Sequence, residues 1–314
     1  MTTATYGHGA PEFGPALTAE EARGVTDELT TLIGDALGRP VRVVGTAVPL
    51  AGGPIFRAYD GSGAAVASAR WALDPVTARR LLDEAAVLAQ VAEAAEQGSP
   101  LVAPRLIALT TRHGWPLLVQ EAGPPAYPTR PPTPEALRTA ERAVARMVTT
   151  ADLDRSYATQ LRTVLEGLER SSLTERLTAT FELLAERHDL DALARGAWHG
   201  NWSPATTASS AVGGSRVLAW GWERFGVNRP LGFDSLHFRL AQLRRDGRSS
   251  GAGAALVREA PRLLADWPIG AEDRDCVARL LLLELAAREI EEVGTRHAPV
   301  SWAADWLAPT LSIA

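Results

Sequence analysis

Two short stretches of the sequence concentrate the side chains that could do chemistry. The first is HGNWSPAT, which starts at His199, and the second is Gly221-Trp222-Glu223. Together they supply an imidazole, an amide, two hydroxyls and one carboxylate, from His199, Asn201, Ser203, Thr206 and Glu223. Imidazole and carboxylate groups can move protons, whereas an amide cannot accept one at neutral pH. The chain contains no lysine, so all 32 of its basic residues are arginine.

The length and composition indicate a globular protein and argue against several classes of partner. At 314 residues, with 46% hydrophobic and 22% charged residues, the chain is long enough for one two-lobed unit or two domains with a hydrophobic core. Its net charge of −5 and pI of about 5.8 argue against nucleic acid or an anionic membrane as a partner, as does the lack of a long basic stripe. No apolar run is long enough to predict a transmembrane helix.

The single cysteine and the first residues favour a cytoplasmic protein. One cysteine cannot form an intrachain disulfide, which fits a reducing compartment. Cys276 shares a helical stripe with Leu280, Leu283 and Ile290, so we expect a buried core thiol and not a nucleophile. Residues 1–16 lack the charged and apolar regions of a secretory signal, and we expect them to form a flexible tail.

The elements that position these residues follow from the periodicity of the sequence. Residues 17–122 are expected to form one α+β lobe. It would contain helices at 18–38 and 74–95, and strands at 41–50, 55–59, 64–71, 105–110 and 117–120. A capping box at Thr18–Glu21 opens the first helix, and Asp60–Gly63 is typical of a hairpin turn.

The second half of the chain is predicted to be mostly helical. Residues 123–134 are rich in Pro and Gly and are expected to link the two lobes. The second lobe is expected at residues 135–314. The pattern predicts helices at 134–150, 155–187, 230–246, 252–266, 272–293 and 300–308. Two loops and one strand, residues 216–220, interrupt these helices between Trp198 and Trp222. The two chemistry-bearing stretches lie in those loops.

The same stretches resemble motifs of the aminoglycoside phosphotransferase and choline kinase-like family. HGNWSPAT resembles that family's H-G-D-x-x-x-x-N loop, and VLAWGWERF from Val217 resembles its strand followed by Asp-Trp-Glu. PLGFDSLH from Pro230 resembles its next helix entry, where an Asp is usual. The resemblance spans roughly residues 40 to 300. It implies a protein kinase-like α+β fold, with a small antiparallel sheet and one long helix in the first lobe and a mostly helical second lobe.

The resemblance also implies which positions would carry phosphoryl transfer, and there the chain departs from the family. The catalytic Asp falls at Asn201, and the Mg²⁺-binding Asn falls at Thr206, a shorter and weaker oxygen ligand. The Asp that holds Mg²⁺ on the phosphates falls at Gly221, which has no side chain. Phosphoryl transfer depends on positioning and on such charged groups. We therefore expect the Mg²⁺-ATP site to be lost, with no metal and no cofactor.

In the first lobe, the phosphate-binding Lys of the family falls at Arg70 and its partner Glu at Glu84. We expect these two residues, which belong to a degenerate nucleotide site, to lie close together and to survive as an ion pair, because Arg pairs strongly with carboxylates. Gly52-Gly53-Pro54 falls where a phosphate-covering loop would be, but so short a motif is typical of a plain turn.

We interpret the chain as a pseudokinase that acts by binding. The residues expected in its cleft are His199, Asn201, Trp202, Ser203, Trp222 and Glu223, although His199 is commonly structural and both Trp residues commonly pack in the core. The expected partner is a protein or peptide, or a small molecule in the old acceptor cleft. The resemblance implies, as an expectation, a role as a partner subunit in bacterial natural-product biosynthesis, such as ribosomal peptide modification.

Two alternatives stay open. The cleft could catalyse a reaction that does not use Mg²⁺-ATP, or the chain could keep a residual, atypical phosphotransferase activity. The second alternative needs a displaced carboxylate, for which Glu223 and Asp234 are the nearby candidates.

Overall fold

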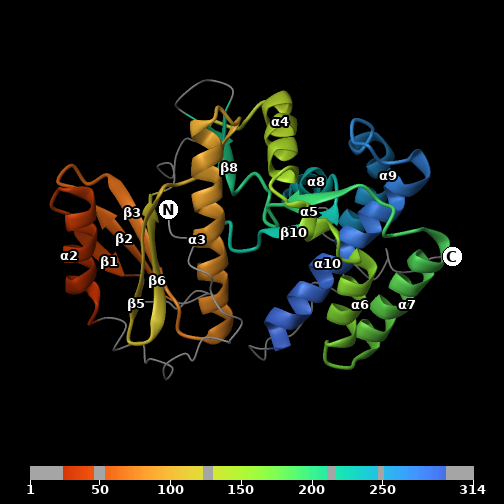
Figure 1. Ribbon diagram of the computed structural model, residues 1–314, viewed down its shortest axis with the longest axis horizontal. Coiled ribbons are helices and arrows are strands. Elements are labelled where there is room, and N and C mark those ends of the chain that lie inside the picture. Colours follow the sequence, from red (N-terminus) through yellow and green to blue (C-terminus); the bar gives the residue numbers. More distant parts are fainter. Residues whose placement is uncertain (1–23, 46–53, 123–129, 211–215, 247–250, 295–314) are drawn as a thin grey trace. The chain divides into compact units, whose positions relative to one another are not determined.

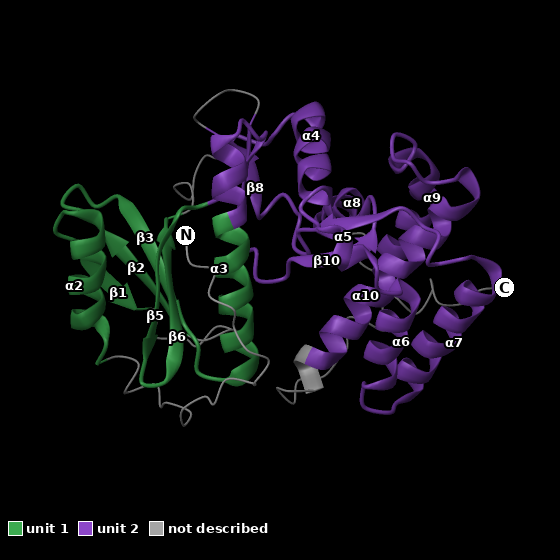
Figure 2. Ribbon diagram, in the orientation of Figure 1, with its two compact units in different colours: residues 1–89, 104–129 green, residues 90–103, 130–314 purple. Residues whose placement is uncertain are grey.

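The computed structural model describes residues 24–45, 54–122, 130–210, 216–246 and 251–294. The predicted tail, the capping box at Thr18–Glu21, Gly52-Gly53, most of the predicted linker and the predicted helix 300–308 lie outside the described residues. The chain divides into two compact units, drawn in different colours in Figure 2. Unit 1 contains residues 1–89 and 104–129, and unit 2 contains residues 90–103 and 130–314.

The described residues of unit 1 form a five-stranded antiparallel sheet with helix α2 and the larger part of helix α3 (Figure 1). Its strand order is β1-β2-β3-β6-β5, with β1 at Arg42–Gly45, β2 at Ile55–Tyr59, β3 at Ala65–Trp71, β6 at Trp115–Glu121 and β5 at Leu106–Arg112. Helix α2 (Thr26–Leu37) buries Leu29 and Ile33. Helix α3 (Pro75–Glu96) buries Leu81 and Ala85 in the same hydrophobic core. The predicted α+β lobe with one long helix is confirmed.

The tight turns of this sheet are explained by the residues within them. Between β2 and β3, the Asp60 carboxylate accepts a hydrogen bond from the Ser62 backbone N–H at 2.9 Å, and Gly63 has a φ of +82°. Between β5 and β6, His113 and Gly114 have φ values of 49° and 81°. Side-chain bonding by Asp and positive φ at Gly are the usual means of making tight turns.

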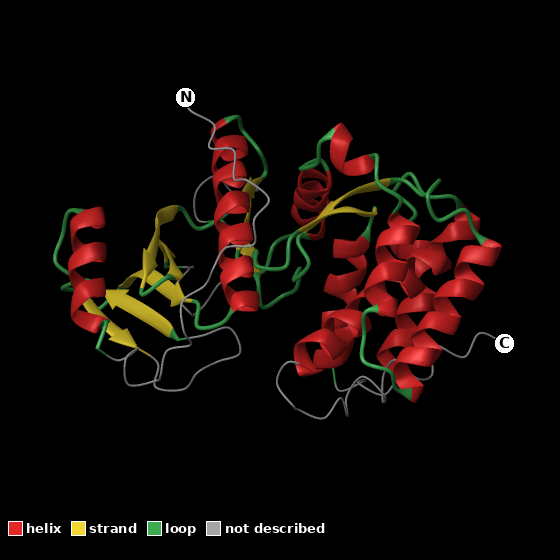
Figure 3. Cartoon of the chain, turned by 60° about the horizontal axis from the view of Figure 1, so that its bottom comes forward, coloured by secondary structure: helices red, strands yellow, loops and turns green. Residues whose placement is uncertain are grey.

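Unit 2 is mainly helical (Figure 3). Its helices are α4 (Pro134–Ala145), α5 (Thr150–Leu153), α6 (Tyr157–Glu166), α7 (Ser172–Arg187), α8 (Phe233–Arg245), α9 (Ala252–Leu263), the 3₁₀ helix η2 (Ala271–Asp273) and α10 (Arg274–Gly294). Cys276, Leu280 and Leu283 are fully buried on α10, as their spacing predicted. Burial raises the pKa of the Cys276 thiol to about 12.

Two helix predictions in unit 2 are wrong. The single helix expected at 155–187 is two helices, because Ser171 accepts a hydrogen bond from the Thr174 backbone N–H at 3.1 Å and begins α7 with a capping box. The helix expected at 230–246 begins at Phe233, because the residues before it form strand β10 (Gly226–Pro230).

Unit 2 also contains two small sheets that carry its loops. Strand β4 (Leu101–Val102) pairs in parallel with β9 (Val217–Ala219), which pairs antiparallel with β8 (Thr207–Ser209). Strand β7 (Arg195–Trp198) pairs antiparallel with β10. Of these five strands the sequence predicted β9 only. Within the part of the chain described here, no helix is long and apolar enough to cross a membrane.

Candidate functional site

Two loops of unit 2 meet because the strands beside them are paired. The loop of residues 199–206 connects β7 to β8, and the loop of residues 220–225 connects β9 to β10. Thr207 of β8 is paired with Ala219 of β9, and the Trp220 backbone N–H donates to the Thr206 carbonyl at 3.1 Å. This pairing brings the end of the first loop to the start of the second.

Gly221 lies at the centre of the residues that the resemblance singled out. A Cβ atom on Gly221 would lie 3.2 Å from Asn201 Nδ2, 3.5 Å from Glu223 Oε2 and 3.6 Å from Thr206 Cγ2. The structure therefore brings together Asn201, Thr206 and Gly221, with Glu223 beside them. The atoms around the missing side chain are an amide nitrogen, a carboxylate oxygen and a methyl carbon.

The hydroxyl of Thr206, which falls at the position of a Mg²⁺ ligand, does not point towards Gly221. Its hydroxyl donates to the Asn201 carbonyl, accepts from the Ser203 backbone N–H at 3.1 Å and lies 3.1 Å from Ser203 Oγ. These bonds close the loop and leave the Thr206 methyl nearest to Gly221. The residues in this place do not fit a Mg²⁺ ion bound to nucleotide phosphates, which needs carboxylate and other oxygen ligands. Among the described residues, no group of three or more His, Cys, Asp or Glu could hold a metal ion.

His199 supports the loop from inside. Its side chain is fully buried, and its Nδ1 accepts a hydrogen bond from the Asn201 backbone N–H at 3.2 Å. Its ring lies 4.2 Å from the ring of Trp222 and 5.4 Å from that of Trp202. Burial lowers the pKa of His199 to about 3, so the imidazole is neutral and poorly suited to general acid–base work near pH 7.

Asp234, at the start of α8, is committed to holding the same loop. Its carboxylate accepts the His199 backbone N–H at 2.9 and 3.1 Å. Burial raises the pKa of Asp234 to about 8, against the hydrogen bond from His199 that lowers it. A carboxyl group engaged in this way is not available as a displaced metal ligand, which leaves Glu223 as the carboxylate beside Gly221.

Gly200 allows the two loops to approach closely. It has a φ of +77°, and a Cβ atom there would lie 1.9 Å from the Arg224 carbonyl oxygen. Only glycine fits such an approach at a left-handed backbone conformation.

Glu141 is a buried acid that the sequence reading missed. It lies on α4, accepts a hydrogen bond from Trp202 Nε1 at 3.0 Å and another from the Ser235 hydroxyl. Burial raises the pKa of Glu141 to about 7, against both hydrogen bonds. The available signal was an acid on the face of α4 that also buries Ala140 and Val144. Since Trp202 is fully buried here, it is a core residue and not a ligand-stacking surface.

Trp222 is likewise a core residue. Its side chain is fully buried, and its Nε1 donates to the Ala219 carbonyl at 3.0 Å. The expected cleft residues thus separate into two groups. His199, Trp202 and Trp222 are internal, whereas Asn201, Ser203 and Glu223 are only partly buried.

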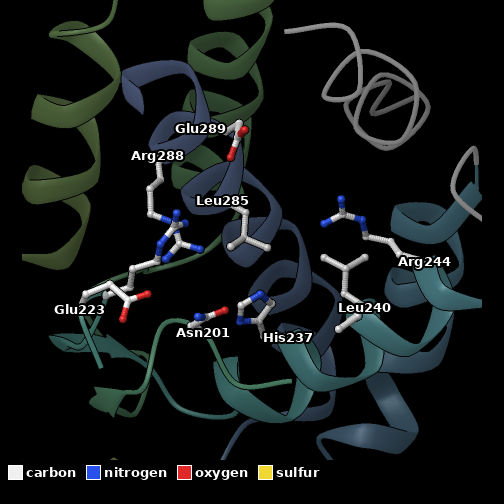
Figure 4. Close-up of a pocket in the computed structure, with 10 residues that line it drawn as sticks. Asn201, Glu223, His237, Leu240, Arg244, Leu285, Arg288 and Glu289 are labelled. Carbon is white, nitrogen blue, oxygen red and sulfur yellow. The ribbon is translucent and has the colours of Figure 1, made fainter. Parts of the chain in front are cut away.

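A cavity of about 230 Å³ opens next to Asn201 (Figure 4). It lies within unit 2 and is lined by Asn201, Glu223, Arg224, His237, Leu240, Ala241, Arg244, Leu285, Arg288 and Glu289. Figure 4 shows Asn201 between Glu223 and His237, with Arg288 reaching towards them from α10 and Arg244 on the opposite wall. Sequence reasoning identified two of these residues, Asn201 and Glu223.

The two residues singled out in unit 1 are in contact. Arg70 on β3 forms an ion pair with Glu84 on α3, and the Glu84 side chain is fully buried. The predicted proximity of Arg70 and Glu84 is confirmed. Loss of either partner would be strongly destabilising, because it would leave the other charge buried without compensation.

The sequence matches no protein-family model and no curated protein. Solved structures are similar in fold over nearly the whole chain. Choline kinase LicA from Streptococcus pneumoniae has a TM-score of 0.57 at 10% identity, covering 91% of this chain and 95% of its own. Aminoglycoside phosphotransferase APH(4)-Ia, in a ternary complex with AMP-PNP and hygromycin B, has a TM-score of 0.53 at 10% identity, covering 88% and 94%. The streptomycin–ATP complex of APH(2")-IIa has a TM-score of 0.53 at 9% identity, covering 90% and 95%.

These likenesses confirm the predicted fold. The chain has the α+β, protein kinase-like fold of aminoglycoside phosphotransferases and choline kinase, with an antiparallel sheet in the first unit and helices in the second.

Proposed function

We propose that this protein is a catalytically inactive relative of these phosphotransferases, and that it acts by binding a ligand or partner. The observation that supports this is the set of atoms around Gly221. A metal ligand is replaced there by a hydrogen atom, and the neighbouring Asn201 and Thr206 turn an amide nitrogen and a methyl group towards it.

Each change removes a different part of phosphoryl transfer. Asn201 cannot accept a proton from an attacking hydroxyl, and the Thr206 hydroxyl is occupied in closing its loop. Arg70, where the resemblance places a phosphate-binding Lys, pairs with the buried Glu84 and carries a planar guanidinium in place of a compact ammonium. Groups that act as a unit are strongly non-additive, so loss of several leaves little of the rate. The proposal therefore assigns the chain a partner role, such as that of a subunit in a natural-product pathway that modifies peptides.

A second candidate function is residual phosphotransfer with Glu223 as a substitute ligand. The observation that favours it is the Glu223 Oε2 atom, which lies 3.5 Å from where a Cβ on Gly221 would be. One carboxylate is at the lower limit for a Mg²⁺ site, which is usually completed by phosphates and water.

Titration with Mg²⁺-ATP, together with an assay of ATP turnover, tests both candidates. We expect the wild type to show no turnover and no Mg²⁺-dependent binding. The double variant Asn201→Asp with Gly221→Asp should gain weak Mg²⁺-dependent binding but no activity, because Thr206 and Arg70 are unchanged.

The matched pair of variants is Glu223→Gln and Glu289→Gln, since both acids line the same cavity. Turnover by the wild type that Glu223→Gln abolishes and Glu289→Gln preserves would establish the second candidate instead. Micromolar or tighter binding of Mg²⁺-ATP by the wild type without turnover would contradict the lost nucleotide site and make the protein a nucleotide sensor.

A further inference from the structure

One buried carboxyl group joins the loop of residues 199–206 to two helices. Glu141 lies on α4 with 4% of its surface exposed, and its Oε1 accepts from Trp202 Nε1 of the loop at 3.0 Å. Its Oε2 accepts from the hydroxyl of Ser235 near the start of α8. Ser235 in turn accepts from Trp267 Nε1 at 3.2 Å. A single side chain therefore connects α4, the loop and α8.

The charges around Glu141 do not compensate for its burial. Arg138 and Arg142 come from its own helix and are exposed. Asp234 on α8 is a second buried acid, and the two carboxyl groups interact unfavourably when both are charged. The two hydrogen bonds that Glu141 accepts favour its ionised form, but burial outweighs them. Ionisation of Glu141 therefore favours any state of the protein in which water reaches the carboxylate.

The start of the loop is held by other groups. The Asp234 carboxylate accepts the His199 backbone N–H at 2.9 Å, and Arg288 Nη1 donates to the Gly200 carbonyl at 2.8 Å. Trp202 is the residue through which the loop is hydrogen-bonded to α4. Asn201 lies between these two attachments and lines the cavity described above. Opening of the loop at Trp202 would therefore displace part of a cavity wall.

Trp222 provides an internal comparison for Trp202. Both side chains are fully buried, but Trp222 Nε1 donates to the Ala219 backbone carbonyl, at 3.0 Å. Its ring lies 4.2 Å from that of His199, which stays neutral above its pKa of about 3. The two indole N–H groups thus differ in one respect that matters here, because only the acceptor of Trp202 can gain or lose a proton.

We propose that Glu141 is a proton-sensitive link that attaches the loop of residues 199–206 to α4. Protonated Glu141 holds the loop closed at Trp202. When Glu141 loses its proton to solvent, the loop opens at Trp202 more often, because opening lets water reach the carboxylate. The open state is a minor one, since exposing Trp202 costs apolar burial. Rising pH would thereby loosen the cavity wall that Asn201 forms, whether or not the protein is a catalyst.

Hydrogen exchange of the Trp202 and Trp222 indole N–H groups tests the proposal. It is followed by NMR from pH 5 to pH 8 and corrected for the intrinsic effect of pH, and Trp202→Phe and Trp222→Phe assign the two signals. We expect protection of Trp202 to fall about tenfold or more over this range, since an opening that releases one proton changes its equilibrium by up to about tenfold per pH unit. Protection of Trp222 should change much less.

Two acids of α4 provide matched variants. Glu141→Gln should make protection of Trp202 independent of pH, because glutamine still accepts from the indole and does not titrate. Glu135→Gln, which changes an exposed acid of the same helix, should keep the trend of the wild type.

Three outcomes would each overturn the proposal. Protection of Trp202 that is constant with pH would show that its opening is not linked to a proton. An equal fall at Trp202 and Trp222 would show that unit 2 opens as a whole. A fall at Trp202 that persists in Glu141→Gln would assign the proton to another group, such as Asp234. None of these outcomes depends on ATP turnover or on Mg²⁺, so the proposed function is tested separately.

Discussion

At the scale of single residues, Glu141 makes the stability of the protein depend on pH. Its folded pKa of about 7 lies above its ordinary value of 4.5, and burial is the cause. The folded state therefore binds a proton that the unfolded state releases, so stability falls as pH rises from about 4.5 to about 7 and then levels off. Nearby Arg138 and Arg142 oppose this shift, and Asp234 lies close enough to interact with Glu141.

We predict that Glu141→Gln gains stability relative to the wild type as pH is raised through this window. Glutamine can still accept from Trp202 and Ser235, and it does not titrate. Urea unfolding at pH 5, 6, 7 and 8 measures the difference. Glu135→Gln, an exposed acid on the same helix, should show no such trend, and a flat difference for Glu141→Gln would contradict the raised pKa.

Residue identities in the candidate site could be read from the sequence, but their orientations could not. The convergence of Asn201 and Gly221 followed from two motifs in order. The direction of the Thr206 hydroxyl depends on its bonds to Ser203 and the Asn201 carbonyl, which are properties of a folded loop. Arg244 and Arg288 carry no local signal, because only the packing of α8 and α10 brings them to one cavity.

At the scale of elements, the ion pair of Arg70 and Glu84 joins β3 to α3 inside unit 1. We predict that Arg70→Met lowers the free energy of unfolding by about 3 kcal/mol or more, because it leaves the Glu84 carboxylate buried without its counter-charge. Replacing both residues, as Arg70→Met with Glu84→Leu, should cost less than the single change. Urea denaturation of the wild type, both single variants and the double variant measures the coupling between the two residues.

The control is Arg79→Met, which breaks an exposed pair with Asp83 on the same helix. Exposed pairs of this spacing contribute about 0.5 kcal/mol or less. Equal effects of Arg70→Met and Arg79→Met would show that the buried pair adds nothing.

Helices and strands could be predicted where the residues within or next to them mark them. The β2–β3 hairpin was marked by its Asp60–Gly63 turn, and α10 by its apolar stripe. Strands β4 and β8 have two and three residues, too few to show alternation, and β4 pairs only with a segment far along the chain. The break between α6 and α7 was missed because the helical pattern continues on both sides of it.

At the scale of the whole molecule, residues 90–103 belong to unit 2 although they lie in the first third of the chain. Their strand β4 pairs with β9, and the Pro100 carbonyl accepts from the Val217 backbone N–H at 2.8 Å. We predict that a fragment of residues 130–314 is less stable and less soluble than a fragment of residues 90–314, because it exposes the edge of β9.

Soluble yield and thermal melting of the two fragments measure this effect. A single residue change within β4, Leu101→Ala, should shift the melting temperature of the longer fragment downward, since Leu101 is buried. Equal melting of the two fragments would show that residues 90–103 do not contribute to unit 2.

The buried thiol of α10 is a natural probe for opening of the hydrophobic core of unit 2. Cys276 is the only cysteine in the sequence, and it is fully enclosed by the helical core. A thiol reagent can reach it only when that core opens, and the raised pKa suppresses the reactive thiolate until then. The rate at which a thiol reagent modifies Cys276 under native conditions therefore reports the opening of unit 2, without any engineered probe.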